Sequence, residues 1–173
     1  MRTSLRTLTL VLAALGLVAL GASISRQVAG GAFSLALALP VVVWLGLDAA
    51  VVEGAVAAAA VGVVLDAAAG GPAGLCVFLS VMLFLASRAA AGTFDAESLL
   101  GFALLSGVGT LLFGLAAILL TRYVSPTEEA PGWGLAGRVV VEALLTALCA
   151  PGVRWVLDRL AAPFHGEDPG LLR

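Results

Sequence analysis

Long apolar runs that carry almost no charge constrain this chain more than any other feature. Of its 173 residues, 61% are hydrophobic and 21 are glycine, whereas only 12% are charged. A soluble domain carries about a quarter charged residues, because its surface must stay hydrated. The net charge is −2 and no basic run occurs that would collect phosphates, which argues against a soluble enzyme and against a nucleic-acid-binding protein. The chain is therefore predicted to be an integral membrane protein.

Six apolar runs have the composition of membrane-spanning helices. A span needs about 20 mostly apolar residues, because the hydrocarbon layer is about 30 Å thick and each helical residue rises about 1.5 Å. The runs are continuous and rich in the helix formers Ala and Leu, unlike the alternating strands of a barrel. The predicted fold is a single all-α membrane domain, with spans at about 5–24, 32–47, 54–69, 73–87, 99–121 and 135–157 and a flexible cytoplasmic tail at 161–173.

The first run ends near a possible cleavage site, and the fourth run is shorter than an ordinary span. Ala19-Leu20-Gly21 resembles a signal-peptidase site, but the apolar stretch before it is longer than a signal peptide needs and nothing soluble follows. We therefore expect a retained span. The fourth run is short for a span, so we expect it either to tilt little or to continue into the Ala-rich stretch after Arg88.

The second and third runs are separated by two acids. Without a break, residues 32–69 would form a helix about 57 Å long, almost twice the thickness of the hydrocarbon layer. Asp48 and Glu53 mark the turn, although no turn residue lies between Ala49 and Val52, so the boundary is soft. The clearest turn in the sequence is Gly70-Gly71-Pro72, because Gly accepts positive φ and Pro ends a preceding helix.

The distribution of arginine predicts the orientation in the membrane. Six spans place both termini on one side, and cytoplasmic loops are enriched in basic residues. With the termini inside, six arginines lie on the inner side and three on the outer side; the inner ones are Arg2, Arg6, Arg88, Arg154, Arg159 and Arg173, and the outer ones are Arg26, Arg122 and Arg138. Both termini are therefore expected in the cytoplasm.

The sequence gives no support for catalysis or for a bound cofactor or metal. Cys76 and Cys149 lie in apolar runs without a second ligand at metal-binding spacing, so we interpret them as small hydrophobic residues. His165 stands alone in the tail. A phosphate-binding loop is excluded as well, because the chain contains no Lys.

Acidic residues within the spans are the remaining candidates for function. A carboxylate at the bilayer centre costs about 2.5–3.5 kcal/mol, so Glu53, Asp66 and Glu142 should lie near an interface, be paired or face a polar cavity. Asp66 has two interpretations. In one, it accepts backbone N–H groups from the following turn; in the other, it anchors a helix pair or contacts a partner.

Small residues recur at every fourth position around Asp66. The stripe consists of Gly54, Ala58, Gly62, Asp66, Gly70 and Gly74. In lipid, such faces let helix backbones approach closely. Shorter stripes follow on the fifth and sixth runs, at Ser106, Thr110 and Gly114 and at Glu142, Thr146 and Ala150. They fit ordinary packing within the bundle as well as contact with a partner.

The stretch from Gly62 to Leu75 resembles the G-x-x-x-D-x-x-x-G-x-x-x-G signature of the MreD family of rod-shape-determining membrane proteins. It reads Gly62-Val-Val-Leu-Asp66-Ala-Ala-Ala-Gly70-Gly-Pro-Ala-Gly74-Leu75. The segment from Glu142 to Leu160, with Pro151 followed by two arginines, is similar to the last helix of that family. The chain departs from the family in having Asp48 and no Arg between its second and third runs, and only Arg88 where a basic cluster usually follows the fourth.

The resemblance implies a non-enzymatic subunit of the bacterial cell-elongation complex, located in the bacterial cytoplasmic (inner) membrane. Such a subunit would bind the single-span scaffold protein MreC in the membrane, together with the MreB filament and peptidoglycan synthases, and would support the regulation of peptidoglycan synthesis and cell shape. The residues expected to pack helices or contact a partner are Gly54, Gly62, Asp66, Gly70, Gly71, Pro72, Gly74, Glu142 and Pro151.

The implied fold is similar to the six-helix substrate-binding components of energy-coupling-factor transporters, which supplies an alternative function: a vitamin-type binding subunit of a transporter. A cavity for such a ligand needs convergent polar and aromatic groups. The chain has one Tyr, three Trp and a single Gln. This scarcity favours the scaffold interpretation, although fold alone does not decide between the two.

Overall fold

The computed structural model describes residues 36–69, 73–92, 98–124 and 133–161, together with Gly16. These residues form helices and their connections, without strands, so the all-helical prediction is confirmed for them. The described helices are α2 (Ala38–Asp48), α3 (Val51–Ala69), α4 (Leu75–Ala91), α5 (Leu99–Val124) and α6 (Trp133–Ala161). The expected first span, 5–24, and nearly all of the expected tail lie outside the described residues.

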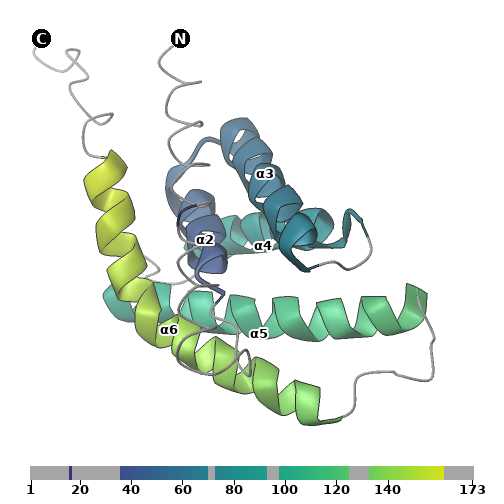
Figure 1. Ribbon diagram of the computed structural model, residues 1–173. Helices are drawn as coiled ribbons and strands as arrows, with labels where there is room; N and C mark the ends of the chain where they lie inside the picture. The colour runs from purple at the N-terminus through teal and green to yellow at the C-terminus, as the bar shows by residue number, and fades with distance from the viewer. Residues whose placement is uncertain (1–15, 17–35, 70–72, 93–97, 125–132, 162–173) are drawn as a thin grey trace, which may run out of the picture.

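Helix α2 lies at the centre of the bundle (Figure 1). All nine residues from Ala38 to Gly46 are buried, and α2 packs against each of the other four helices. With 11 residues it is about 16 Å long, roughly half the thickness of a bilayer core. It begins six residues after the expected start at Ala32, because Leu37 and the residue before it are not helical. Such a short, protein-covered helix is tolerated at membrane depth because its backbone does not face lipid.

The break between α2 and α3 falls at Ala49, whose ψ of 155° is extended. This places the turn between Asp48 and Glu53, as the two acids predicted, but α3 begins at Val51 rather than Gly54. Glu53 consequently lies in the first turn of α3, where the positive end of the helix dipole favours a carboxylate.

Helix α4 reaches Ala91 and so continues into the Ala-rich stretch beyond Arg88, which was one of the two expectations for that run. Helices α5 and α6 are the longest, with 26 and 29 residues, and each extends beyond its expected range. Helix α5 begins where it does because the Ser98 hydroxyl accepts a hydrogen bond of 3.0 Å from the Gly101 N–H, an N-cap that satisfies one of the free amides of the first turn.

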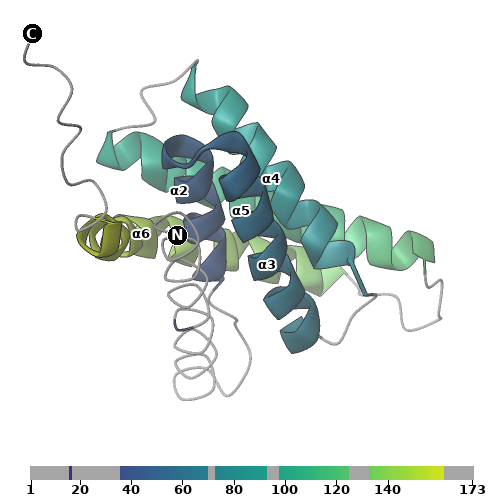
Figure 2. The same ribbon diagram turned by 90° about the horizontal axis from the view of Figure 1, so that it is seen from above.

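Two helix pairs enclose α2. Figures 1 and 2 show α3 and α4 on one side of the pair formed by α5 and α6, and α4 also packs against α5. The core between them is apolar and draws on every described helix; it includes Val42, Leu45, Ala58, Val61, Phe84, Phe102, Val153 and Leu157.

The outer surface is apolar as well, which sets this chain apart from a soluble bundle. Among the described residues, three helices are long and apolar enough to cross a membrane, over Val51–Ala68, Leu99–Tyr123 and Gly137–Arg159, whereas α2 and α4 are shorter apolar helices. On α5, the exposed fractions of Leu100 and Leu119 are 77% and 68%. Large apolar side chains exposed along whole helices would bring a soluble protein out of solution, whereas they match a lipid environment. The described helices therefore fit an integral membrane protein.

Candidate functional site

Asp66 joins α3 to the beginning of α4 through two hydrogen bonds. One carboxylate oxygen accepts the N–H of Gly74 at 2.8 Å, and the other accepts the N–H of Cys76 at 2.8 Å. The first amides of a helix have no intrahelical acceptor, and Gly74, the N-cap of α4, has no side chain to supply one. The carboxylate of a neighbouring helix therefore caps α4, at the end where the helix dipole favours negative charge.

The local backbone explains why glycine stands at position 74. Its φ of +89° lies in the left-handed region, which an L side chain rarely adopts. This turn brings the N–H groups of Gly74 and Cys76 toward the same carboxylate. Gly70, Gly71 and Pro72, the expected turn, lie outside the described residues.

Gly62 lets the backbones of α3 and α4 approach one another. A Cβ at Gly62 would lie 2.8 Å from the carbonyl oxygen of Cys76, and nearer still to the Cα of Val77. Both neighbours are backbone atoms, which a change of rotamer cannot move. Gly62 is therefore required for close packing between these two helices.

Gly54 lies two turns before Gly62 on α3 and leaves room for a side chain of α4. A Cβ at Gly54 would lie 2.7 Å from Cζ of Phe84, whose ring is fully buried. Ala58, between the two glycines, is fully buried too. The small-residue stripe of α3 is therefore covered by the chain's own helices between Gly54 and Gly62, which means that this part of the face serves packing within the chain.

The other stripes also lie between helices of the chain. A Cβ at Gly114 of α5 would lie 2.6 Å from Cγ1 of Val139 on α6, and one at Gly107 would lie 2.9 Å from the Cβ of Ala147. Ser106 and Thr146 are fully buried, and Thr110 is nearly so. Gly107 and Gly114 therefore let α5 and α6 lie close to one another.

Glu142 and Pro151 both lie on α6. Glu142 is half-buried, one turn before the buried Thr146. Pro151 stands inside the helix, which continues past it to Ala161. Because proline lacks an N–H, it removes one hydrogen bond from the ladder at this point, and Figure 1 shows that α6 is curved.

A polar cluster that sequence reasoning missed lies where α2 and α6 end and α5 begins. The indole Nε1 of Trp44 donates a hydrogen bond of 3.0 Å to one oxygen of Asp158. The other Asp158 oxygen lies 3.7 Å from Nε of Arg154. Arg154 also reaches α5: its guanidinium lies 5.4 Å from the ring centroid of Phe102 and 3.4 Å from the carbonyl oxygen of Ser98.

The i, i+4 spacing of Arg154 and Asp158 was the available signal for this cluster, since such pairs face each other on a helix. The partner of Asp158 was not visible, because Trp44 lies 114 residues away in the sequence. At the same end of α2, Arg88 of α4 donates a hydrogen bond of 2.7 Å to the carbonyl oxygen of Ala49. A cation at the C-terminus of a helix is favoured by the helix dipole.

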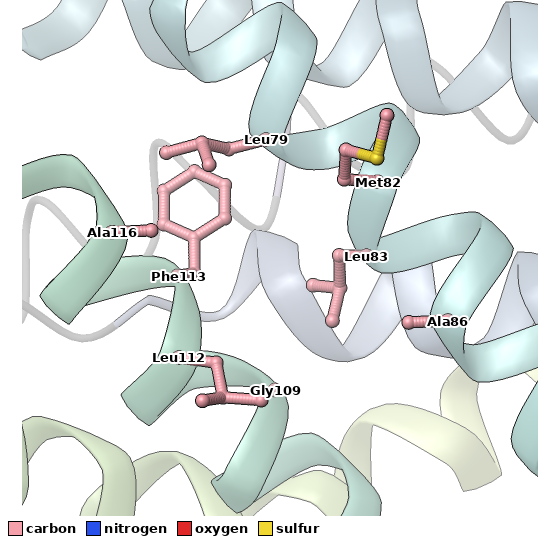
Figure 3. Close-up of a pocket in the computed structure, with 8 residues that line it drawn as sticks. All are labelled: Leu79, Met82, Leu83, Ala86, Gly109, Leu112, Phe113 and Ala116. Carbon is pink, nitrogen blue, oxygen red and sulfur yellow. The ribbon is translucent and has the colours of Figure 1, made fainter. Parts of the chain in front are cut away.

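Two of the grooves between neighbouring described helices are lined by apolar residues. The first, of about 210 Å³, lies between α4 and α5, where Leu79 and Met82 face Leu112 and Phe113 (Figure 3). The second, of about 230 Å³, lies between α5 and α6. Neither has the convergent polar groups that orient a polar ligand.

Within the described part of the chain, no group of three or more His, Cys, Asp and Glu side chains could hold a metal ion. Cys76 is buried and Cys149 is exposed, and both are free thiols. Neither a family model, nor a curated protein, nor a solved structure matches this chain.

Proposed function

We propose that this protein is a non-enzymatic, six-span subunit of a bacterial cell-elongation complex, similar to MreD, in the cytoplasmic membrane. It would bind a single-span scaffold of the MreC type and, with the MreB filament and peptidoglycan synthases, support cell shape. The observation that carries this proposal is the signature from Gly62 to Gly74, in which Gly62 permits close helix packing while Asp66 and Gly74 build the cap of α4.

The positions of the polar groups support a topology in which successive helices cross the membrane in alternate directions. Ala49, Arg88, Ser98 and Arg154 come from different connections or helix ends, and contacts link Ala49 to Arg88 and Ser98 to Arg154. In a six-span topology with both termini inside, all four belong to the cytoplasmic side. Asp66 and Gly74 belong to the opposite side, where they bond to each other.

The small-residue face of α3 is covered within the chain, so we propose that the partner contact lies on other helices. Because residues between Gly54 and Gly62 lie against the chain's own helices, that face offers no surface to MreC while the hairpin is closed. The outward faces of α5 and α6 carry apolar side chains that stay accessible in the membrane, with Leu104 and Leu144 each 66% exposed and Leu148 79% exposed. On α3 and α4, Val63 and Phe78 are exposed too. We place the contact with a spanning helix on α5 and α6, because these two helices offer the longest apolar faces.

Disruption of the gene in its own organism tests the biological role. Rod-shaped cells should become round, and the wild-type chain should restore the rods. If cells without the protein keep their shape and instead lose uptake of a vitamin, the transporter alternative replaces this proposal. Genes for a single-span coiled-coil protein beside this one would agree with the first outcome, and genes for ATPase subunits would agree with the second.

Co-purification from detergent tests the partner. The tagged full chain should retain the MreC protein of the same organism. Leu144→Trp and Leu148→Trp, on the accessible face of α6, should lower the recovery of MreC without changing the yield of the chain. Val63→Trp, at an exposed apolar position of α3 and therefore outside this face, serves as the matched control. Equal recovery with all three variants would exclude this face as the partner surface.

A further inference from the structure

The last turns of α6 carry two side-chain pairs that serve different purposes. Arg154 and Asp158 form an ion pair at i, i+4 that is tied to α2 and α5. Trp155 and Arg159 form a second i, i+4 pair, one residue further along, and both of its members are exposed. Because successive helical residues are about 100° apart, the second pair faces a different direction from the first.

The geometry of the exposed pair prepares an arginine for anion binding. The guanidinium carbon of Arg159 lies 5.0 Å from the centroid of the Trp155 ring, within the range of a cation–π contact. Such a contact uses the face of the guanidinium, whereas the N–H groups lie along its edge. Trp155 thus restrains the long Arg159 side chain and leaves the donors at its edge available for a bidentate acceptor.

The position of the pair matches the headgroup layer of a bilayer. Arg159 is the last residue of the apolar window Gly137–Arg159, and Trp155, with 62% of its surface exposed, lies one turn before it. Tryptophan favours the membrane interface, where its ring is in contact with both lipid and headgroups. The guanidinium one turn further along therefore reaches the level of the lipid phosphates.

We propose that Trp155 and Arg159 form a binding site for the phosphate headgroup of an anionic phospholipid. The positive guanidinium complements the negative phosphate and matches two of its oxygens with parallel N–H groups. Arg154 does not take this role, because its guanidinium is held by Asp158, Ser98 and Phe102. The site goes beyond the proposed function, since it requires a bilayer and does not depend on which protein the chain binds.

Native mass spectrometry of the purified full chain, titrated in detergent with phosphatidylglycerol or phosphatidylcholine, tests this site. The wild type should bind phosphatidylglycerol more tightly than phosphatidylcholine. Arg159→Gln should weaken phosphatidylglycerol binding about tenfold, and Trp155→Leu about threefold, because the charge stays and only the stacking is lost. Arg122→Gln is the matched control, an exposed arginine in the last turn of another long apolar helix.

Three results would overturn the proposal. Equal effects of Arg159→Gln and Arg122→Gln would show that any exposed arginine suffices. Equal affinity for the two lipids would remove the requirement for an anionic headgroup. Displacement of the lipid by millimolar inorganic phosphate would make the site one for a free anion. If Arg159→Gln lowers the melting temperature, Arg159→Lys separates an effect on stability from an effect on lipid binding. Lysine keeps the positive charge but lacks the two parallel N–H groups of the guanidinium, so binding should still fall by several-fold.

Discussion

The α3–α4 hairpin and the α5–α6 hairpin both use small residues to pack, but Gly62 of the first and Gly114 of the second differ in what they meet. In the first, a Cβ at Gly62 would collide with backbone atoms of α4. In the second, a Cβ at Gly114 would meet the γ-methyl groups of Val139. Gly107 resembles Gly62 instead, because the Cβ of Ala147 that it faces is fixed by the backbone of α6. Side chains adjust by changing rotamer, whereas a helix backbone moves only as a whole.

The two hairpins also differ in their polar contacts. The first is closed by the Asp66 carboxylate at its turn. The second is joined by Arg154 to the start of α5, and to α2 through Asp158, at the end far from its turn. Small residues at the same spacing should therefore differ in their tolerance to substitution.

Gly62→Leu should have the largest effect. Four added carbons would force α3 and α4 apart, and overpacking of this kind costs about 1–3 kcal/mol or more. We expect loss of most folded protein in detergent, measured by size-exclusion chromatography and thermal unfolding. Gly137→Leu, at a position where nothing lies within 4 Å, is the control and should be tolerated. Comparable yields of the two variants would show that the helices are not in close contact at Gly62.

Asp66→Ala should be the next most damaging change. It removes the acceptor of two N–H groups at the start of α4, and loss of a helix cap costs about 0.5–2 kcal/mol. The midpoint of thermal unfolding should fall. Asp66→Asn keeps one acceptor oxygen and should lie between the wild type and Asp66→Ala. If both variants unfold with the wild type, the cap does not stabilise this hairpin.

Trp44→Phe tests the hydrogen bond that joins α2 to the α5–α6 hairpin. The hydrogen bond to Asp158 is lost, which should cost about 1 kcal/mol, and a further loss follows because the phenyl ring is smaller than the buried indole. Asp158→Asn leaves an acceptor for the indole and should be milder. In the double variant the two losses should not add, because the interaction is shared. Full additivity would mean that the two residues act independently.

Gly114→Ala should have the smallest effect of the series. Alanine gains about 0.5–1 kcal/mol over glycine in a helix interior, and this gain offsets the displacement of the Val139 side chain. We expect a change in the unfolding free energy close to zero. Combining it with Val139→Ala, which removes the obstructing methyl groups, tests the cause. A loss as large as that of Gly62→Leu would abolish the distinction between the two hairpins.

Several features were predictable because they depend on neighbours in the sequence. The break between Asp48 and Glu53 was predictable because an unbroken helix would be almost twice as long as the hydrocarbon layer is thick. Helix α5 begins at its expected residue, Leu99, directly after Ser98, which caps it. One interpretation of Asp66, an acceptor for the following turn, agrees with its two hydrogen bonds. The late start of α2 at Ala38 was not predictable, since the apolar run before it continues without interruption.

Composition and periodicity by themselves determined that the described chain is helical and apolar enough for a membrane, because lipid accepts few other backbone arrangements. They also marked the small residues at every fourth position. Only the tertiary structure decided what those residues meet: backbone at Gly62 and side chain at Gly114. It also decided that Trp44 and Asp158 meet at all, since a contact across 114 residues depends on how the helices pack. Sequence spacing reports which residues share a helix face, whereas the identity of the facing helix depends on the whole bundle.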